Sequence, residues 1–286
     1  MSNDILIPFH KFPLHDKKYS VDRGYVFEKF YCSNTGFPWE KKISDYREDE
    51  WSAKIPLMIY HTAIMNDSRR FYISPQPVSF LMRPQGKNAL DNKLEIDAID
   101  FRAFFRKQGG DSLLVTSAMR MNATFPFFFP NPALPSEPST YVMDGGALDN
   151  FGVETTLRFL NTFQDWINQN TSGVVVLQIR DSEKFEEPVA AEQKTVFARL
   201  TDPLGTVYTN MENMQDFLTD HRLDEMDEEL RGKLEFVLFE YTTEREEDKA
   251  AMSLHLTTRD KRDLLKSANR ANNVRSFNRL QQLQSE

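Results

Sequence analysis

Short apolar segments separated by polar, proline-containing loops dominate the hydrophobic pattern of this sequence. Residues 55–65, IPLMIYHTAIM, are apolar on both alternating faces, which predicts a strand covered on both sides. Residues 173–179, GVVVLQI, are rich in β-branched side chains and predict a second buried strand. Residues 141–143 predict a short strand, and residues 151–169 carry apolar side chains at helical spacing. Strand 141–143, helix 151–169 and strand 173–179 together predict a right-handed βαβ crossover, a parallel sheet and an α/β fold.

Weaker signals predict further elements on both sides of this unit. Residues 1–54 are expected to be a loop-rich segment with one helix at its end, because prolines interrupt every periodic run. The second predicted segment is 55–183, and the third, 184–286, is a mainly helical extension with at least one strand. Additional predictions are a strand at 71–74, a helix from an Asp97 cap to Lys107 stopped by Gly109-Gly110, and a helix from Ser112 to Asn122. In the extension they are a helix at about 204–220, a strand from Leu234 to Tyr241 and a last helix starting near Thr257.

The composition describes a folded protein and excludes several classes of site. The chain has 286 residues, of which 40% are hydrophobic, enough for one large domain or two small ones. A formal net charge of −8 opposes binding to nucleic acid. Cys32 is the only cysteine, and the five histidines show no zinc-binding spacing, so no disulfide framework and no metal centre are expected. Glycine is too scarce for a phosphate-binding loop, and no cofactor is expected.

Charge and hydropathy also bear on location. No run approaches the ~18 apolar residues of a membrane span, and the N-terminus lacks the apolar segment of a signal peptide, so a cytoplasmic protein is expected. Residues 224–248 hold 11 acidic and 3 basic side chains, whereas residues 257–280 hold 7 basic and 2 acidic ones. These two segments are either solvated or mutually salt-bridged helical faces, or the basic helix lies on an anionic membrane surface.

An aspartate followed by two glycines, in YVMDGGALDNFG, is the main candidate for chemistry. Asp144 follows the predicted strand 141–143, the position where open α/β sheets build ligand crevices. Gly145 and Gly146 allow backbone conformations and close approaches that a Cβ blocks. The simpler interpretation is a tight turn. A carboxylate metal site built from Asp144 and Asp149 needs further oxygen ligands that the local sequence does not supply.

Two other segments accompany the DGG turn in a fixed order: SAMRMNATFPFFFP before it and Asn150 after it. Their order and spacing resemble the C-terminal half of the patatin-like phospholipase family, over about residues 55–180. The matching positions are Ser117-Ala118, Ala123-Thr124-Phe125-Pro126, Phe128-Phe129-Pro130, Asp144-Gly145-Gly146 and Asn150. The resemblance implies a partial three-layer fold with a mainly parallel sheet and the hydrolysis of lipid acyl esters by a Ser–Asp dyad. Asp144 matches the dyad aspartate.

The sequence departs from that family in lacking both GxSxG and the DGGGxRG-type loop. Ser112, Ser117 and Ser139 lack the glycine-flanked turn that exposes such a nucleophile. The first hypothesis is therefore the C-terminal portion of a patatin-like acyl hydrolase, inactive as an isolated chain and partnered by a serine-bearing N-terminal half. The alternative is a non-catalytic lipid-binding or interaction protein that keeps the apolar FPFFFP surface. Strands 55–65, 141–143 and 173–179 are expected in one sheet, with Asp144 accessible at its rim.

Overall fold

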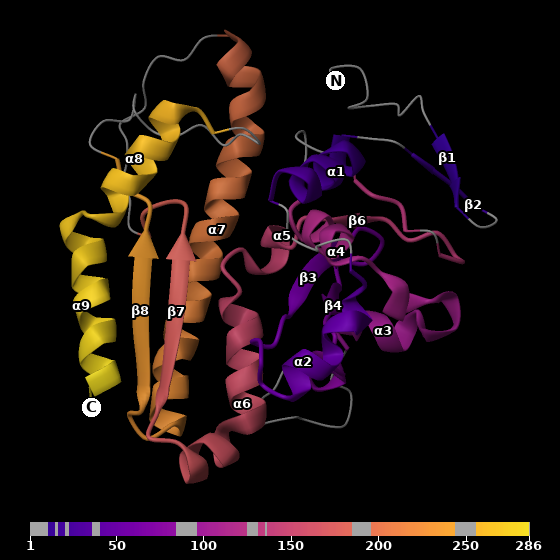
Figure 1. The fold of residues 1–286 in the computed structure, drawn as a ribbon. Coiled ribbons are helices and arrows are strands. Elements are labelled where there is room, and N and C mark those ends of the chain that lie inside the picture. The colour runs from indigo at the N-terminus through magenta and orange to yellow at the C-terminus, as the bar shows by residue number, and fades with distance from the viewer. Residues whose placement is uncertain are drawn as a thin grey trace. The chain divides into compact units, whose positions relative to one another are not determined.

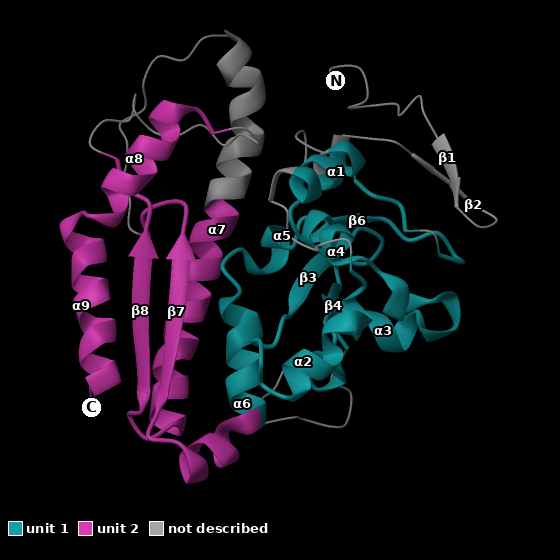
Figure 2. Ribbon diagram, in the orientation of Figure 1, with its two compact units in different colours: residues 1–162 teal, residues 163–286 magenta. Residues whose placement is uncertain are grey.

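A boundary inside a long helix, between Thr162 and Phe163, divides the chain of the computed structural model into two units (Figure 2). This boundary lies within the predicted segment 55–183. The structure describes residues 11–14, 17–20, 23–35, 41–83, 96–124, 131–134, 136–184, 196–243 and 256–285. The FPFFFP segment, residues 125–130, lies outside the described residues.

The first unit contains a four-stranded mixed sheet with the strand order β5-β4-β3-β6 (Figure 1). The central strand β3 is antiparallel to both β4 and β6, and β4 is parallel to β5. The prediction of a mainly parallel sheet is therefore wrong for this unit. The short 65–69 connection between β3 and β4 allows only an antiparallel pair, because parallel strands need a long crossover. The bounds are β3 Tyr60–Ile64, β4 Arg70–Ile73, β5 Ala98–Asp100 and β6 Val142–Met143.

The predicted βαβ crossover is also wrong. The short strand β6 pairs with β3 in the first unit, whereas β7, Val174–Arg180, pairs in parallel with β8, Leu234–Glu240, in a separate two-stranded sheet. The helix between β6 and β7, α6, spans Val153–Asn170. Strands 141–143 and 173–179 thus do not share a sheet. Their order along the chain indicated a crossover, but β7 finds a partner of equal length much later in the sequence.

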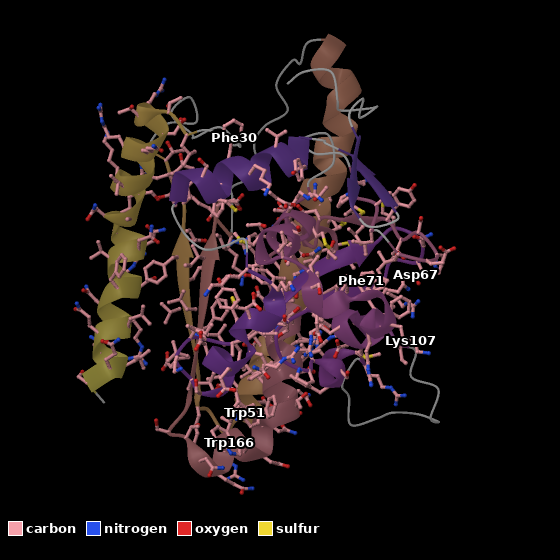
Figure 3. The ribbon with its side chains drawn as sticks, turned by 45° about the vertical axis from the view of Figure 1, so that its right-hand side comes forward. Phe30, Trp51, Asp67, Phe71, Lys107 and Trp166 are labelled. Carbon is pink, nitrogen blue, oxygen red and sulfur yellow. The ribbon has the colours of Figure 1, made fainter. Side chains whose placement is uncertain are left out.

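Phe71 on β4 lies in the core of the first unit, which combines aliphatic side chains with a small group of aromatic rings (Figure 3). The Phe71 ring lies 5.5 Å from the rings of both Phe101 and Phe105. The predicted helix from Asp97 to Lys107 is only partly present. Ala98–Asp100 form strand β5, and Asp100 caps the short helix α3, Phe101–Phe104. Pairing with β4 outweighs the local capping signal, while Gly109 adopts φ 79° and ends the turn that follows, as predicted.

Helix α4, Val115–Asn122, begins three residues later than predicted and packs against β3. The segment before β3 holds more structure than the single predicted helix, namely a β-hairpin and two helices. The remaining elements of this unit are β1 Lys11–Leu14, β2 Lys17–Ser20, α1 Arg23–Thr35, η1 Ile43–Tyr46, α2 Arg47–Trp51, η2 Ser79–Leu81, η4 Arg106–Gln108, η5 Gly110–Ser112 and α5 Gly146–Asp149.

The second unit builds helices around the β7–β8 pair (Figure 1). Helix α7, Val196–Glu229, is held to β7 by a bidentate ion pair between Arg180 and Asp216, with both N–O distances 2.8 Å. Helix α9, Ala271–Ser285, packs on β8, where the rings of Phe239 and Phe277 lie 4.7 Å apart. Helix α8, Thr258–Ala268, begins at a capping box formed by Thr257 and Asp260. The predicted strand from 234 and the helix start near Thr257 are confirmed.

Every helix in the described part of the chain is too short or too polar to span a bilayer.

Candidate functional site

The DGG turn links β6 to α5 and is fixed by backbone hydrogen bonds to the end of α4. The Asp144 amide donates to the Thr124 carbonyl at 3.1 Å, and the Gly145 amide donates to the Asn122 carbonyl at 3.2 Å. The Gly145 carbonyl accepts from the amides of Leu148 and Asp149 at 2.9 and 3.1 Å. Hydrogen bonds to the end of α4 and to α5 therefore fix the backbone of the turn, and with it the position from which the Asp144 side chain extends.

His61 on β3 packs directly against Gly145. Its Nε2 lies 3.1 Å from the Gly145 carbonyl oxygen, which can only accept, so Nε2–H donates. A Cβ on Gly145 would lie 2.5 Å from the His61 carbonyl oxygen and 2.8 Å from the imidazole. This close approach is the physical reason for glycine at position 145. Burial lowers the pKa of His61, although the charge of Asp149 partly opposes the shift, so the imidazole is neutral at pH 7.

His61 is buried and internally satisfied. Its place beside the DGG turn was not predicted, because 84 residues separate His61 from Gly145. Asn122 also contacts His61: its side-chain Oδ1 accepts a hydrogen bond from the His61 backbone N–H at 3.0 Å. Asn122 belongs to no sequence motif of its own. Neither residue carries a spacing signal that could have revealed this contact.

Asp144 itself is a carboxylate that is mostly buried and has no cationic partner among the described residues. Its Oδ1 accepts from the Gly146 amide at 2.6 Å, and this is its only hydrogen bond to the described part of the chain. Burial raises the pKa of Asp144 to about 6, and the hydrogen bond from Gly146 offsets part of that rise. The side chain is less accessible than predicted, and its second oxygen has no donor among the described residues.

Asp149, five residues further on, has a structural role. Its Oδ1 accepts from the Glu154 amide at 3.0 Å, and its Oδ2 accepts from the Thr155 amide and hydroxyl at 2.8 and 2.7 Å. Asp149 thereby satisfies the amides of the first turn of α6. Because both its oxygens are engaged, it does not form a metal site with Asp144. No group of three or more His, Cys, Asp or Glu side chains in the described ranges is placed to hold a metal ion.

A charged network holds the segment that follows the DGG turn. The Arg70 guanidinium donates to the Leu148 carbonyl at 3.2 Å and to the Asp97 carboxylate at 3.1 Å. Arg158 on α6, with only 2% of its side chain exposed, binds the same carboxylate and also Glu154 at 2.8 Å. Burial would raise the pKa of Asp97, but the hydrogen bonds and charge of Arg158, with the charge of Arg70, lower it. These contacts tie α5 and α6 to the sheet.

The serines considered from the sequence are not joined to Asp144. The Ser117 hydroxyl on α4 donates to Glu28 on α1 at 3.2 Å, and Glu28 also pairs with Arg120 at 2.7 Å. Ser112 lies in the turn η5, and Ser139 is exposed. No hydrogen bond links a serine to Asp144 within the described residues, so the structure contains a candidate base without its nucleophile.

Comparisons with protein-family models, with curated proteins and with solved structures give no match to this chain.

Proposed function

We propose that Asp144 is the general base of a lipid acyl-ester hydrolase of the patatin-like type. The serine nucleophile comes from a polypeptide segment other than these 286 residues. The observation that carries the proposal is the state of Asp144, whose carboxylate is mostly buried, has no cationic partner in the described residues and has a pKa raised to about 6. A base with a pKa just below the working pH is both deprotonated and able to accept a proton.

Three other buried aspartates provide the contrast that supports this choice. Asp149 caps α6, Asp216 is bound by Arg180, and Asp100 accepts from the backbone and from Ser79. Each of these carboxylates is stabilised by the partners around it. Among the described residues, Asp144 accepts a single side-chain hydrogen bond, from the Gly146 amide, and has no cationic partner, so its ionised state is unfavourable. Strongly perturbed groups of this kind concentrate at functional sites.

In this proposal each residue of the turn has a role. The Gly146 amide holds Oδ1 of Asp144, which leaves Oδ2 to accept the proton of an incoming serine hydroxyl. Gly145 allows the turn to approach His61 closely and so fixes the direction of the Asp144 backbone. His61 is a neutral donor to the turn and positions it. The serine would attack the ester carbonyl as its proton passes to Asp144, and that proton would go to the alcohol as the C–O bond between alcohol and acyl group breaks. Water, giving a proton to Asp144, would then attack the acyl-serine, and the proton would return to the serine oxygen as the acid leaves.

The substrate class follows from the resemblance, and the surface of α8 fits a lipid interface. Arg259, Lys261, Arg262 and Lys266 are exposed on this helix, and Leu265 among them is 70% exposed. Basic side chains near an anionic membrane contribute about 1 kcal/mol each. We therefore include peripheral contact of α8 with an anionic lipid surface in the proposal. Co-sedimentation with phosphatidylserine vesicles, compared with phosphatidylcholine vesicles, tests this contact.

The experiment is reconstitution. This chain is co-expressed with a GxSxG-bearing N-terminal half of a patatin-like enzyme, and turnover of a nitrophenyl ester is measured for the wild type and for Asp144→Asn. The substitution keeps the shape of the side chain but removes the base, so turnover should fall by orders of magnitude. Asp67→Asn, on an exposed turn of the same unit, is the control and should retain activity. Full activity in Asp144→Asn, or lipid binding without turnover in the wild-type pair, would overturn the proposal, and the second result would favour a non-catalytic lipid-binding protein.

A further inference from the structure

The β7–β8 sheet has an uncovered strand. Parallel sheets occur almost only where both faces are covered. On β7, Val176 and Arg180 point to the face that α7 covers and are buried. The alternate side chains Val175, Leu177 and Ile179 are exposed by 45%, 46% and 73%. Helix α9 covers this second face over β8, where Val237 is 3% exposed, but leaves these three apolar residues of β7 open.

The outer edge of β7 lies opposite the edge that pairs with β8. No strand other than β8 pairs with it in the described ranges. Natural edge strands are protected by lysine, proline, bulges or short length. The sequence of residues 174–179, VVVLQI, contains no charged residue and no proline, and all seven residues of β7 pair with β8 in one unbroken register. The outer edge of β7 therefore lacks the features that keep an edge strand from pairing with a further strand.

We propose that β7 is the dimerisation edge of this chain and pairs antiparallel with β7 of a second copy, around a two-fold axis at Leu177. The stripe of exposed residues is symmetric about that position. In this register Leu177 faces Leu177 of the second copy, and Val175 faces Ile179, so all three apolar side chains meet apolar partners on one face. The two sheets join into one four-stranded sheet with the order β8-β7-β7-β8.

The charges of α7 favour the same arrangement. Residues 224–229, DEMDEE, hold five acidic side chains and no basic one. The two-fold axis makes the two α7 helices antiparallel, which separates these acidic segments. A stable interface buries about 800 Å² on each partner, more than a single strand pair supplies, so surfaces of the second unit beside β7 have to contribute as well.

The first test is the oligomeric state, measured for the full chain by sedimentation at micromolar concentrations. The wild type should be a dimer, and Leu177→Lys should make it a monomer, because two lysines would face each other at the axis. Leu265→Lys, at a 70% exposed position of α8, is the control and should leave the dimer intact. A monomeric wild type would overturn the proposal, whether β7 is covered by another part of this chain or by a different polypeptide. A dimer that resists Leu177→Lys would overturn it too.

The second test measures the register of the β7–β7 pairing by disulfide cross-linking between copies. In a Cys32→Ser background, Leu177→Cys should form a disulfide between copies, because directly opposed residues of antiparallel strands lie within disulfide range. Val175→Cys and Ile179→Cys should cross-link when mixed with each other, and neither should do so alone. Equal cross-linking of Val175→Cys alone would contradict the two-fold axis at Leu177. This inference does not rest on the proposed acyl-ester hydrolysis, and its tests need no activity.

Discussion

Asp144 is in an unfavourable electrostatic position, because burial raises its pKa above the ordinary value of 3.8 to about 6. The folded state therefore binds a proton more tightly than the unfolded state between about pH 4 and pH 6. Over that range the stability contributed by this group falls as the pH rises, and the loss is complete at pH 7. Two pH units correspond to about 3 kcal/mol, which partial exposure of the side chain reduces to the order of 1–3 kcal/mol.

Asp144→Asn should therefore stabilise the protein at pH 7. The asparagine oxygen still accepts from the Gly146 amide, and the buried charge is gone. The expected gain is on the order of 1–3 kcal/mol at pH 7 and much less at pH 4.5, measured by urea unfolding at both values. Asp67→Asn is a control of opposite sign, because the hydrogen bond from Arg69 lowers the pKa of Asp67. An equal effect of Asp144→Asn at the two pH values would contradict the pKa of about 6.

Gly145→Ala should destabilise the first unit by about 1–3 kcal/mol, the usual cost of overpacking. The added Cβ meets the His61 carbonyl oxygen at 2.5 Å, so β3 or the turn must shift. Gly152→Ala gives the comparison, because Gly152 has φ 70° and open space around it, so its cost is conformational, about 1 kcal/mol. The two variants are compared by thermal unfolding. A milder effect for Gly145→Ala than for Gly152→Ala would contradict the steric argument.

These residues also mark what the sequence could predict about the site. Asp144, Gly145 and Gly146 are adjacent, so their pattern is visible in the sequence, and the turn has the predicted position after a short strand. His61 and Asn122 reach the turn only through the packing of β3 and α4. Their contribution is a long-range contact, and such contacts leave no local pattern in a single sequence.

At the scale of elements, the start of α6 depends on Asp149. Asp149→Ala removes three accepted hydrogen bonds and leaves the first-turn amides and the Thr155 hydroxyl with fewer partners. The loss should be about 1–2 kcal/mol, the usual cost of removing an N-cap. Asp149→Asn keeps one acceptor oxygen and should cost less. Urea unfolding of both variants measures the difference, and equal losses would show that the cap is not the origin of the effect.

Local patterns predicted the presence of most elements but not their pairing. The periodicity of residues 151–169 predicted α6 closely, and the β-branched run at 173–179 predicted β7. Strand β5 was missed, because three residues, Ala98–Asp100, form a strand only through their pairing with β4. The partner of β7 was misassigned for the same reason. Neighbouring strands along the chain usually pair, but here the match of β7 and β8 in length and register decides.

At the scale of the whole molecule, the isolated chain should show no ester hydrolysis above background. Asp144 has no serine within hydrogen-bonding distance in the described residues, and the Ser117 hydroxyl is engaged by Glu28. A base without a nucleophile does not perform acyl transfer. Nitrophenyl butyrate turnover by the purified chain checks this. Saturable turnover that a Ser117→Ala substitution abolishes would contradict it and would place the nucleophile inside this chain.

The kcat/KM of a reconstituted pair should follow the ionisation of Asp144 as the pH changes. A general base acts only when it is deprotonated, so kcat/KM should level off above about pH 7 and approach a tenfold fall for each pH unit below about 5. Contact with a lipid substrate or with the serine-bearing half buries Asp144 further, which would move the limb to higher pH and not to lower pH. Stopped assays from pH 4.5 to 8, with unfolding followed in parallel by circular dichroism, separate this limb from acid denaturation. A fall in kcat/KM centred near pH 4 would mean that Asp144 titrates as an ordinary exposed aspartate. That result would contradict its assignment as the general base.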